Sequence, residues 1–367
     1  MSRGISRLLL VMLAAGVAAA SAQAQPSGAS RDSAALEKKL LEAVRQNPDN
    51  FEAHHMLAVF YLRDGKVKQA LPQLERAAAI NPSSYEVGYD LARALLETGR
   101  LDAARSQVTG WLAKKDNGEL HNLLGDIEQR AGNLIVAADQ FQRAAHMDPV
   151  EEHLFDWGDN LLQLRAYDPA TEVFVASIKR FPQSARLRIG LGIAQYYRGE
   201  YQDAVRSFCD AADRAPSDPR PYQFLGEMYG VSPEMAKEIS SRLARFVETQ
   251  PKNALAHFQY AMSLRKDAGE AAGPDDLRRI EDLLKRAVQL DPSLAKGFFE
   301  LGVLQAEQQR HDEAIDNLRR AATLQPSLSQ AHYRLALVYQ RTGRKDLAAK
   351  ELETFRQLTA ASGGDKQ

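Results

Sequence analysis

Prolines recur along this chain at a nearly fixed interval of about 34 residues, and this periodicity limits the fold more than any other feature. The recurring prolines are Pro48, Pro82, Pro149, Pro182, Pro216, Pro251, Pro292 and Pro326. In the one double interval, Asp116 stands where a proline is expected. A period of this length is typical of stacked helix pairs, in which each unit buries its apolar face against the next. Such a chain offers an extended surface rather than an enclosed pocket.

The stretch from Phe51 to Pro82 shows the pattern of one unit. Apolar residues recur at three- and four-residue spacing on both sides of Gly65, which predicts two amphipathic helices joined by a tight turn. Gly65 suits the left-handed conformation that ends the first helix. The second helix must end before Pro82, because proline disfavours helical backbone in the residue before it.

The same spacing occurs nine times. The first large position is occupied by Leu57, Leu91, Leu124, Trp157, Leu191, Leu225, Tyr260, Leu301 and Leu335. The next residue is always small: Ala58, Ala92, Gly125, Gly158, Gly192, Gly226, Ala261, Gly302 and Ala336. In seven units a second small residue follows on the second helix: Ala70, Ala104, Ala137, Ala170, Ala204, Ala314 and Ala348. Small residues on both helices predict a close approach within each pair.

This pattern resembles the tetratricopeptide repeat (TPR), whose signature joins a large residue, Leu-Gly, an aromatic residue, Ala and a closing Pro. Two stretches carry it most clearly: Leu225-Gly226 with Tyr222 and Tyr229, and Leu191-Gly192 followed by Gly199, Ala204, Phe208, Ala211 and Pro216. The resemblance implies an all-α fold, a right-handed α-solenoid of about nine helix-turn-helix units with the first helices lining a concave groove. It implies a binding scaffold without enzymatic activity.

The domain organisation follows from these boundaries. We predict a secretory signal peptide (1–24), a flexible mature N-terminus (25–32), a capping helix (33–50), a TPR solenoid (51–358) and a flexible tail (359–367). The capping helix is expected to bury the apolar residues Leu36, Leu40 and Ala43. The solenoid is expected to be irregular at 230–280.

The first 24 residues have the features of an export signal. Arg3 and Arg7 give the positive start, an apolar stretch follows from Leu8 to Ala20, and Ala22-Gln23-Ala24 forms a small-x-small cleavage site. The apolar stretch is shorter than the roughly 20 residues that span a bilayer. We therefore expect an exported protein, periplasmic or extracellular, without an integral membrane span after cleavage. An uncleaved N-terminal anchor is the alternative.

Two irregular stretches interrupt the repeats. Lys266 to Asp276 contains about seven extra residues and is expected to form a loop, with Asp275 or Asp276 capping the following helix. Around residue 230, Ser232 is expected to cap a helix that has Pro233 at its first position.

Charge and cysteine content exclude some classes of protein. The formal charge is −1, and it becomes −3 when Arg3 and Arg7 leave with the signal, so the strong basic excess of a nucleic-acid binder is missing. The single cysteine, Cys209, excludes an internal disulfide framework. It follows Phe208 on an apolar face, which favours a buried, inert thiol. An intermolecular disulfide is the alternative.

The sequence contains no signature of an enzyme or a required cofactor. Four histidines share one repeat position: His54, His121, His257 and His332. Packed helices lie about 10 Å apart, whereas zinc ligands lie about 2 Å from one ion, so packing is the interpretation and no metal site is predicted. The carboxylates are expected to be scattered over outer faces as solvated residues, and Glu151-Glu152 and Asp275-Asp276 are tight pairs of identical residues among them.

The positions that line the groove in the resembling family change in character along the chain. Early repeats place polar residues there: Glu86, Arg93, Glu97, Glu119, Asn122, Asp126 and Arg130. Later repeats place apolar and aromatic residues there, and we predict that these bind a ligand: Phe155, Ile189, Ile193, Tyr196, Tyr197, Phe258, Met262, Phe299 and Tyr333. The alternative is that the array buries them between repeats.

The leading hypothesis for the function is a scaffold of the bacterial cell envelope that binds a peptide or helix of another envelope protein in a preformed groove. The first alternative is a polysaccharide-binding or polysaccharide-export accessory protein, because aromatic rows stack on sugar rings. The second is an enzyme with an unfamiliar site, which would require clustered polar groups with shifted pKa values. The third is self-association of copies through the C-terminal end.

Overall fold

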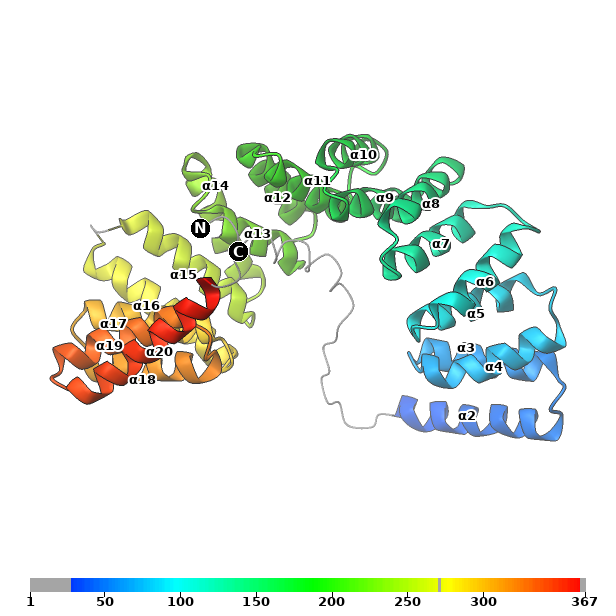
Figure 1. Cartoon of the computed structure of the whole chain (residues 1–367), viewed down its shortest axis with the longest axis horizontal. Coiled ribbons are helices and arrows are strands. Elements are labelled where there is room, and N and C mark those ends of the chain that lie inside the picture. The colour runs from blue at the N-terminus through cyan, green and yellow to red at the C-terminus, as the bar shows by residue number, and fades with distance from the viewer. Residues whose placement is uncertain (1–27, 270–271, 364–367) are drawn as a thin grey trace. The chain divides into compact units, whose positions relative to one another are not determined.

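The computed structural model describes residues 28–269 and 272–363, and all regular structure within these ranges is helical. The predicted signal peptide (1–24) and the end of the predicted tail (364–367) lie outside the described residues. The chain divides into two compact units, the first ending at Arg198 and the second beginning at Gly199. Both are α-solenoids in which each helix packs on the next along the chain, as the repeat period predicts (Figure 1).

The first unit consists of a single helix followed by antiparallel pairs and a final first helix. Its helices are α2 (Gly28–Gln46), α3 (Phe51–Arg63), α4 (Val67–Ile80), α5 (Tyr85–Glu97), α6 (Leu101–Leu112), α7 (Gly118–Arg130), α8 (Leu134–Met147), α9 (Glu151–Gln163), α10 (Tyr167–Arg180) and α11 (Ala185–Tyr197). The first helices α5, α7, α9 and α11 also contact one another in succession, so they form a continuous layer.

The second unit continues the same succession of helices, with an irregular start. Its helices are α12 (Tyr201–Arg214), α13 (Pro219–Met228), the short 3₁₀ helix η1 (Pro233–Met235), α14 (Ala236–Thr249), α15 (Ala254–Ala268), α16 (Pro274–Leu290), α17 (Ala295–Glu307), α18 (His311–Leu324), α19 (Ser329–Arg341) and α20 (Lys345–Gly363). First helices again contact their counterparts, α13 against α15 and α17 against α19.

Small residues hold the two helices of each pair together. The second-helix alanines of the pattern, for example Ala70 and Ala314, are almost fully buried, as predicted. A Cβ built on Gly125 would lie 2.6 Å from the Phe141 ring, which is closer than van der Waals contact. At Gly302 the nearest backbone atoms would lie 3.1 Å away. The small positions therefore set the distance between helices.

The turn inside each pair uses a left-handed residue. Gly65 has φ +69°, as predicted, and other turns place glycine in the same conformation. Arg165 and Gln309 occupy this turn position in their pairs with φ of 60° and 62°. Residues with a Cβ are strained there by roughly 1–2 kcal/mol.

Helix starts in the irregular region differ partly from the prediction. Pro233 does begin a helix, but that helix is the 3₁₀ turn η1, and the Ser232 side chain caps nothing. Its hydroxyl instead donates to the Glu234 carboxylate at 3.4 Å. The extra residues do not all form a loop, because α15 continues to Ala268. Asp276 accepts the Gly273 N–H at the start of α16, as expected for a helix-start carboxylate.

The two end helices are longer than predicted. Helix α2 begins at Gly28 rather than residue 33, and α20 continues to Gly363 rather than ending at 358. Of the apolar residues expected to be buried in α2, only Leu40 is buried, while Leu36 and Ala43 are exposed. The reason is that α2 packs mainly on α3, so only one stripe of its surface is covered.

Replacing Gln309 by glycine should stabilise the protein. Glycine removes the left-handed strain but gains conformational entropy in the unfolded chain, so we expect a net increase of about 0.5–1 kcal/mol in the free energy of unfolding. Urea denaturation of Gln309→Gly measures this change, with Gly65→Ala as the opposite control. A Gln309→Gly protein less stable than the parent would contradict the strain argument.

Replacing Gly158 by alanine should destabilise the first unit. The added Cβ would lie 2.6 Å from the Phe174 ring, which is itself fully buried. Overpacking of this kind costs about 1–3 kcal/mol. In a double-mutant cycle, Phe174→Leu should make the alanine less costly, because the smaller side chain leaves room. Additive effects of the two substitutions would show that this contact does not limit the helix spacing.

Candidate functional site

Four of the predicted ligand-binding residues belong to the core. Phe155, Ile189, Ile193 and Tyr196 are only 7%, 1%, 0% and 8% exposed, so the prediction that they line an open surface is wrong. Neighbouring side chains explain the burial of Phe155. The Arg186 guanidinium lies 3.6 Å from the centre of its ring, and Phe174 packs at 6.1 Å on another side.

Tyr197 is half-buried and held by two other tyrosines. Its ring stacks on Tyr167 with centroids 4.8 Å apart and an angle of 5°, and it meets Tyr196 edge-on at 5.5 Å. Burial raises the pKa of Tyr197 to about 12. One ring face is therefore occupied by Tyr167, and the tyrosine pair acts largely as packing.

The predicted residues of the second unit lie closer to the surface. Phe258, Met262 and Phe299 are half-buried, and Tyr333 is exposed at 41%. The Tyr333 ring lies 5.2 Å from Phe355 of α20, so the last helix supports it. Binding at these four residues stays a prediction.

The structure brings carboxylates together on the first helices of the first unit. The sequence analysis placed Glu86, Glu119 and Asp126 at groove positions there, but it expected the carboxylates in general to be scattered over outer faces. Asp126 of α7 interacts electrostatically with Asp156 and Glu152 of α9, and Asp159 of α9 with Asp156. Asp90 of α5 extends this set toward the N-terminus. The set is named here the acidic face, and its members are Glu86, Asp90, Glu119, Asp126, Glu152, Asp156 and Asp159. A signal was present in the sequence, because Asp90 and Asp156 share one repeat position and Asp126 and Asp159 share another.

Hydrogen bonds between first helices fix the centre of this face. The Asn122 amide of α7 donates to the Asp156 carboxylate at 3.0 Å. Arg186 of α11 donates to the other oxygen of Asp156 at 2.9 Å. The chain Asn122–Asp156–Arg186 thus crosses three helices. Asp126 makes no hydrogen bond or ion pair with any residue that the structure describes.

Burial and mutual repulsion weaken the acidity of these carboxylates. The pKa of Asp126 is raised to about 7, first by burial and then by the charges of Asp156 and Glu152, while Arg93 and Arg186 lower it. The pKa of Asp159 is raised to about 6, again mainly by burial. Burial also raises the pKa of Asp156 and Asp90. An approaching cation would relieve this repulsion, so the face is suited to a positively charged ligand.

The acidic face also displays unsatisfied acceptors. The buried carboxamide oxygens of Asn122 and Asn160 have no donor among the described residues, although their nitrogens donate to Asp156 and to Gln129. Within the described ranges, no three or more His, Cys, Asp or Glu residues are arranged to hold a metal ion. The carboxylates of the acidic face favour a ligand rich in N–H donors.

The four equivalent histidines pack between helices, as predicted. The Nδ1 atoms of His54 and His121 each pair at 2.7 Å with a glutamine nineteen residues further on, Gln73 and Gln140. Their Nε2 atoms bond to the loop before the first helix. The recurring His–Gln spacing could have been found in the sequence. Cys209 is buried, as expected, and burial raises its pKa to about 12.

These features define a class of protein: a helical-repeat scaffold with a charged first-helix face. No helix in the described part of the chain is long and apolar enough to cross a bilayer. Family models for the tetratricopeptide repeat match residues 39–71, 61–127, 155–219 and 330–358, and a model for the TPR repeat matches 306–343. The chain belongs to the tetratricopeptide repeat family, whose members are protein-interaction scaffolds.

Other comparisons give more distant likenesses. The human protein O-mannosyl-transferase TMTC1 is 26% identical over 155 residues, which is 40% of this chain but 18% of that enzyme. A tetratricopeptide repeat protein from Parabacteroides merdae gives a TM-score of 0.46 at 16% identity, covering 78% of this chain and 98% of its own. YrrB, described as a TPR protein with an unusual peptide-binding site, gives 0.41 at 20% identity, covering 53% and 96%.

Replacing Asp126 by asparagine should stabilise the protein above neutral pH. The pKa of about 7 in the folded state exceeds the value near 3.9 in an unfolded chain, so the parent loses stability as pH rises from about 4 to 7. Asparagine removes this loss. We expect a gain of about 1–2 kcal/mol at pH 8 and almost none at pH 4. Denaturation at both pH values measures it, and an equal gain at pH 4 would contradict a titrating Asp126.

Proposed function

We propose that this chain is a non-catalytic scaffold of the bacterial cell envelope that binds a lysine- or arginine-rich segment of a partner protein on the acidic face. One observation carries the proposal: the half-buried carboxylate of Asp126, with a pKa of about 7, forms no ion pair or hydrogen bond with a described residue, although Arg93 and Arg186 lie near enough to lower its pKa. Lysine and arginine side chains supply both the charge and the N–H donors that this surface accepts.

The envelope location depends on the predicted export signal at residues 1–24. Export would place the repeat surface where it meets other exported proteins or the exposed segments of membrane proteins. Peptide mass spectrometry of the protein from a periplasmic fraction tests this part independently, because cleavage after Ala24 predicts a chain that begins at Gln25.

The structure gives less support to the polysaccharide alternative. Stacking on sugars needs open aromatic faces, whereas Phe155 and Tyr196 are buried and Tyr197 is covered on one face by Tyr167. Self-association through α20 has no supporting observation comparable to the charge of the acidic face.

A labelled peptide of alternating lysine and alanine should bind the chain, and its glutamate–alanine counterpart should not. Fluorescence anisotropy at low ionic strength measures both, since salt screens such pairs. The affinity should rise between pH 5 and pH 8 as Asp159 and then Asp126 ionise. The variant Asp126→Asn should lose about five- to tenfold in affinity and much of this pH dependence.

Glu172→Gln provides the matched control, because Glu172 is exposed on the second helix α10 and lies away from the acidic face. Its removal subtracts the same charge and should leave the affinity within about twofold, as expected for a distant, screened charge. Equal losses of peptide affinity in Asp126→Asn and Glu172→Gln would mean that binding depends only on the net charge of the protein. Equal binding of the basic and acidic peptides would overturn the proposal. A pull-down from envelope extract, with residues Gln25 to Gln367 as bait and Asp126→Asn as comparison, would then identify the partner.

A further inference from the structure

One of the four equivalent histidines lacks the partner that the others have. The Nδ1 atoms of His54, His121 and His332 each bond at 2.7 Å to a polar side chain nineteen residues further on. His257 is 8% exposed, and its Nδ1 has no hydrogen-bond partner. Counting back from the closing proline of each repeat, Leu283 holds the position of Gln73, so a side chain that cannot hydrogen-bond replaces the partner.

The hydrogen bond made by the other ring nitrogen, Nε2, fixes the tautomer of this imidazole. His257 Nε2 lies 2.9 Å from the carbonyl oxygen of Pro251, which can only accept, so Nε2 carries a proton and donates. Nδ1 is then an acceptor that has no donor and lies buried behind the cavity lining. A buried polar atom without a partner destabilises the folded state, and a ligand that supplies the partner removes this cost.

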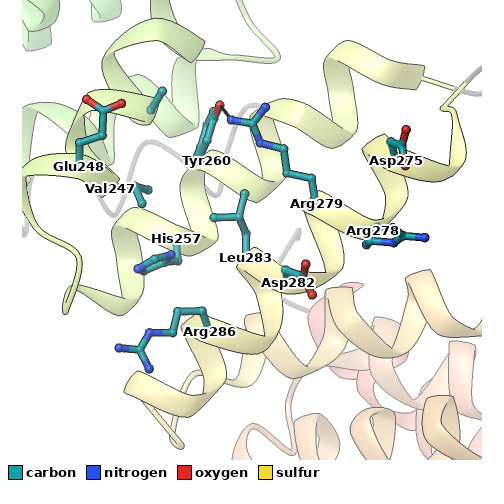
Figure 2. Close-up of a pocket in the computed structure, with 11 residues that line it drawn as sticks. Val247, Glu248, His257, Tyr260, Asp275, Arg278, Arg279, Asp282, Leu283 and Arg286 are labelled. Carbon is teal, nitrogen blue, oxygen red and sulfur yellow. Dashed lines mark hydrogen bonds between the residues drawn. The ribbon is translucent and has the colours of Figure 1, made fainter.

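His257 lines a cavity of about 490 Å³ between α14, α15 and α16 in the second unit. This volume lies within the range of ligand sites, roughly 300–1,000 Å³. Figure 2 shows Arg279, Leu283 and Arg286 in succession along α16, facing the α15 residues Tyr260 and His257. Ala244 and Val247 of α14 add an apolar wall.

Two arginines of this cavity are available to an anion. Arg279 donates to the Tyr260 hydroxyl at 2.7 Å and lies 5.3 Å from the centre of its ring, so its guanidinium is oriented without being neutralised. Neither Arg279 nor Arg286 forms an ion pair with a described residue. Asp275 and Asp282 of α16 also line the cavity, and Asp282 stands three or four residues from Arg278, Arg279 and Arg286, at the spacing where opposite charges on a helix partly offset one another.

We propose that this cavity, named the His257 pocket, is a second binding site that takes the carboxylate side chain of an acidic residue in a partner polypeptide. Arg279 and Arg286 would bind the carboxylate oxygens, and the bound group would supply a partner for the unpaired Nδ1 of His257. The apolar side chains of Ala244, Val247 and Leu283 match the aliphatic stem of a glutamate. A polypeptide is the source that suits a member of an interaction-scaffold family. This site lies on the other unit and does not depend on the acidic face.

The carboxylates that line the pocket make the proposal sharply testable. Glu248 of α14 also faces this cavity and would repel an acidic ligand. Glu248→Gln should therefore strengthen the binding of a carboxylate by about threefold or more. If the pocket instead took a cation, the same substitution would weaken binding, so the direction of the change decides between them.

The experiment is a histidine-selective NMR titration of the full chain with ¹⁵N-labelled rings. The probes are acetyl-glutamate amide, its uncharged analogue acetyl-glutamine amide, and inorganic phosphate. The signals of His257 are identified by their loss in His257→Gln. We expect acetyl-glutamate amide to shift these signals and acetyl-glutamine amide to leave them in place. A response to phosphate alone would point to a phosphorylated ligand and overturn the polypeptide assignment.

Three variants locate the binding. Arg279→Gln and Arg286→Gln should each weaken binding by about tenfold, the effect of losing a charge-assisted hydrogen bond. Arg320→Gln is the matched control, since its guanidinium also lies over a ring, 6.0 Å from the centre of Phe298, but outside the pocket. Leu283→Gln should give His257 the partner that Gln73 gives His54, preserving the fold while weakening the binding of acetyl-glutamate amide.

Three results would contradict the proposed carboxylate site. Equal losses in Arg279→Gln, Arg286→Gln and Arg320→Gln would mean that only overall charge is sensed. Unchanged binding by Leu283→Gln, with a thermal midpoint equal to or above that of the parent, would remove His257 from the site. An unmoved His257 signal with every probe would overturn the pocket altogether.

Discussion

The rest of this structure depends on the close contact between the two helices of each pair. Alanine or glycine stands where the helices meet, and at Gly125 and Gly158 even one methyl group would enter an aromatic ring. This distance determines how one pair stacks on the next, and therefore which side chains of successive first helices lie side by side. Corresponding turns of successive first helices become spatial neighbours, so Asn122 can reach Asp156 although they are 34 residues apart in the chain.

That alignment explains why carboxylates gather on the first unit at a cost in stability. Repetition places aspartate on neighbouring first helices, and partial burial then raises the pKa of each one. Arg186 and the Asn122 amide stabilise the central carboxylate, Asp156, but Asp126 has no such support. A charge arrangement that opposes folding at neutral pH is expected where a protein uses its surface for binding, because the ligand supplies the missing counter-charge.

The repeat period predicted most of the fold because it reports local geometry. The small positions, the left-handed turn at Gly65 and the number of helix pairs follow from spacing alone. The site could not be predicted in the same way. The family's groove positions marked Phe155 as exposed, but Arg186 and Phe174 cover its ring from neighbouring elements. The acidity of Asp126 depends on burial, which a pattern of residue types does not contain.

Repeats also serve as controls for one another, and the histidines show how. The Nδ1 atoms of His54, His121 and His332 all bond to a side chain nineteen residues further on. The absence of this bond at His257 is therefore a local departure rather than a general property of the fold. The departure coincides with the helix α16, which is 17 residues long, and with Arg279 and Arg286, which form no ion pair with a described residue. In a repeat protein, the residues at consensus positions already hold the helices together. The side chains that recognise a particular ligand are therefore expected where a repeat departs from the consensus.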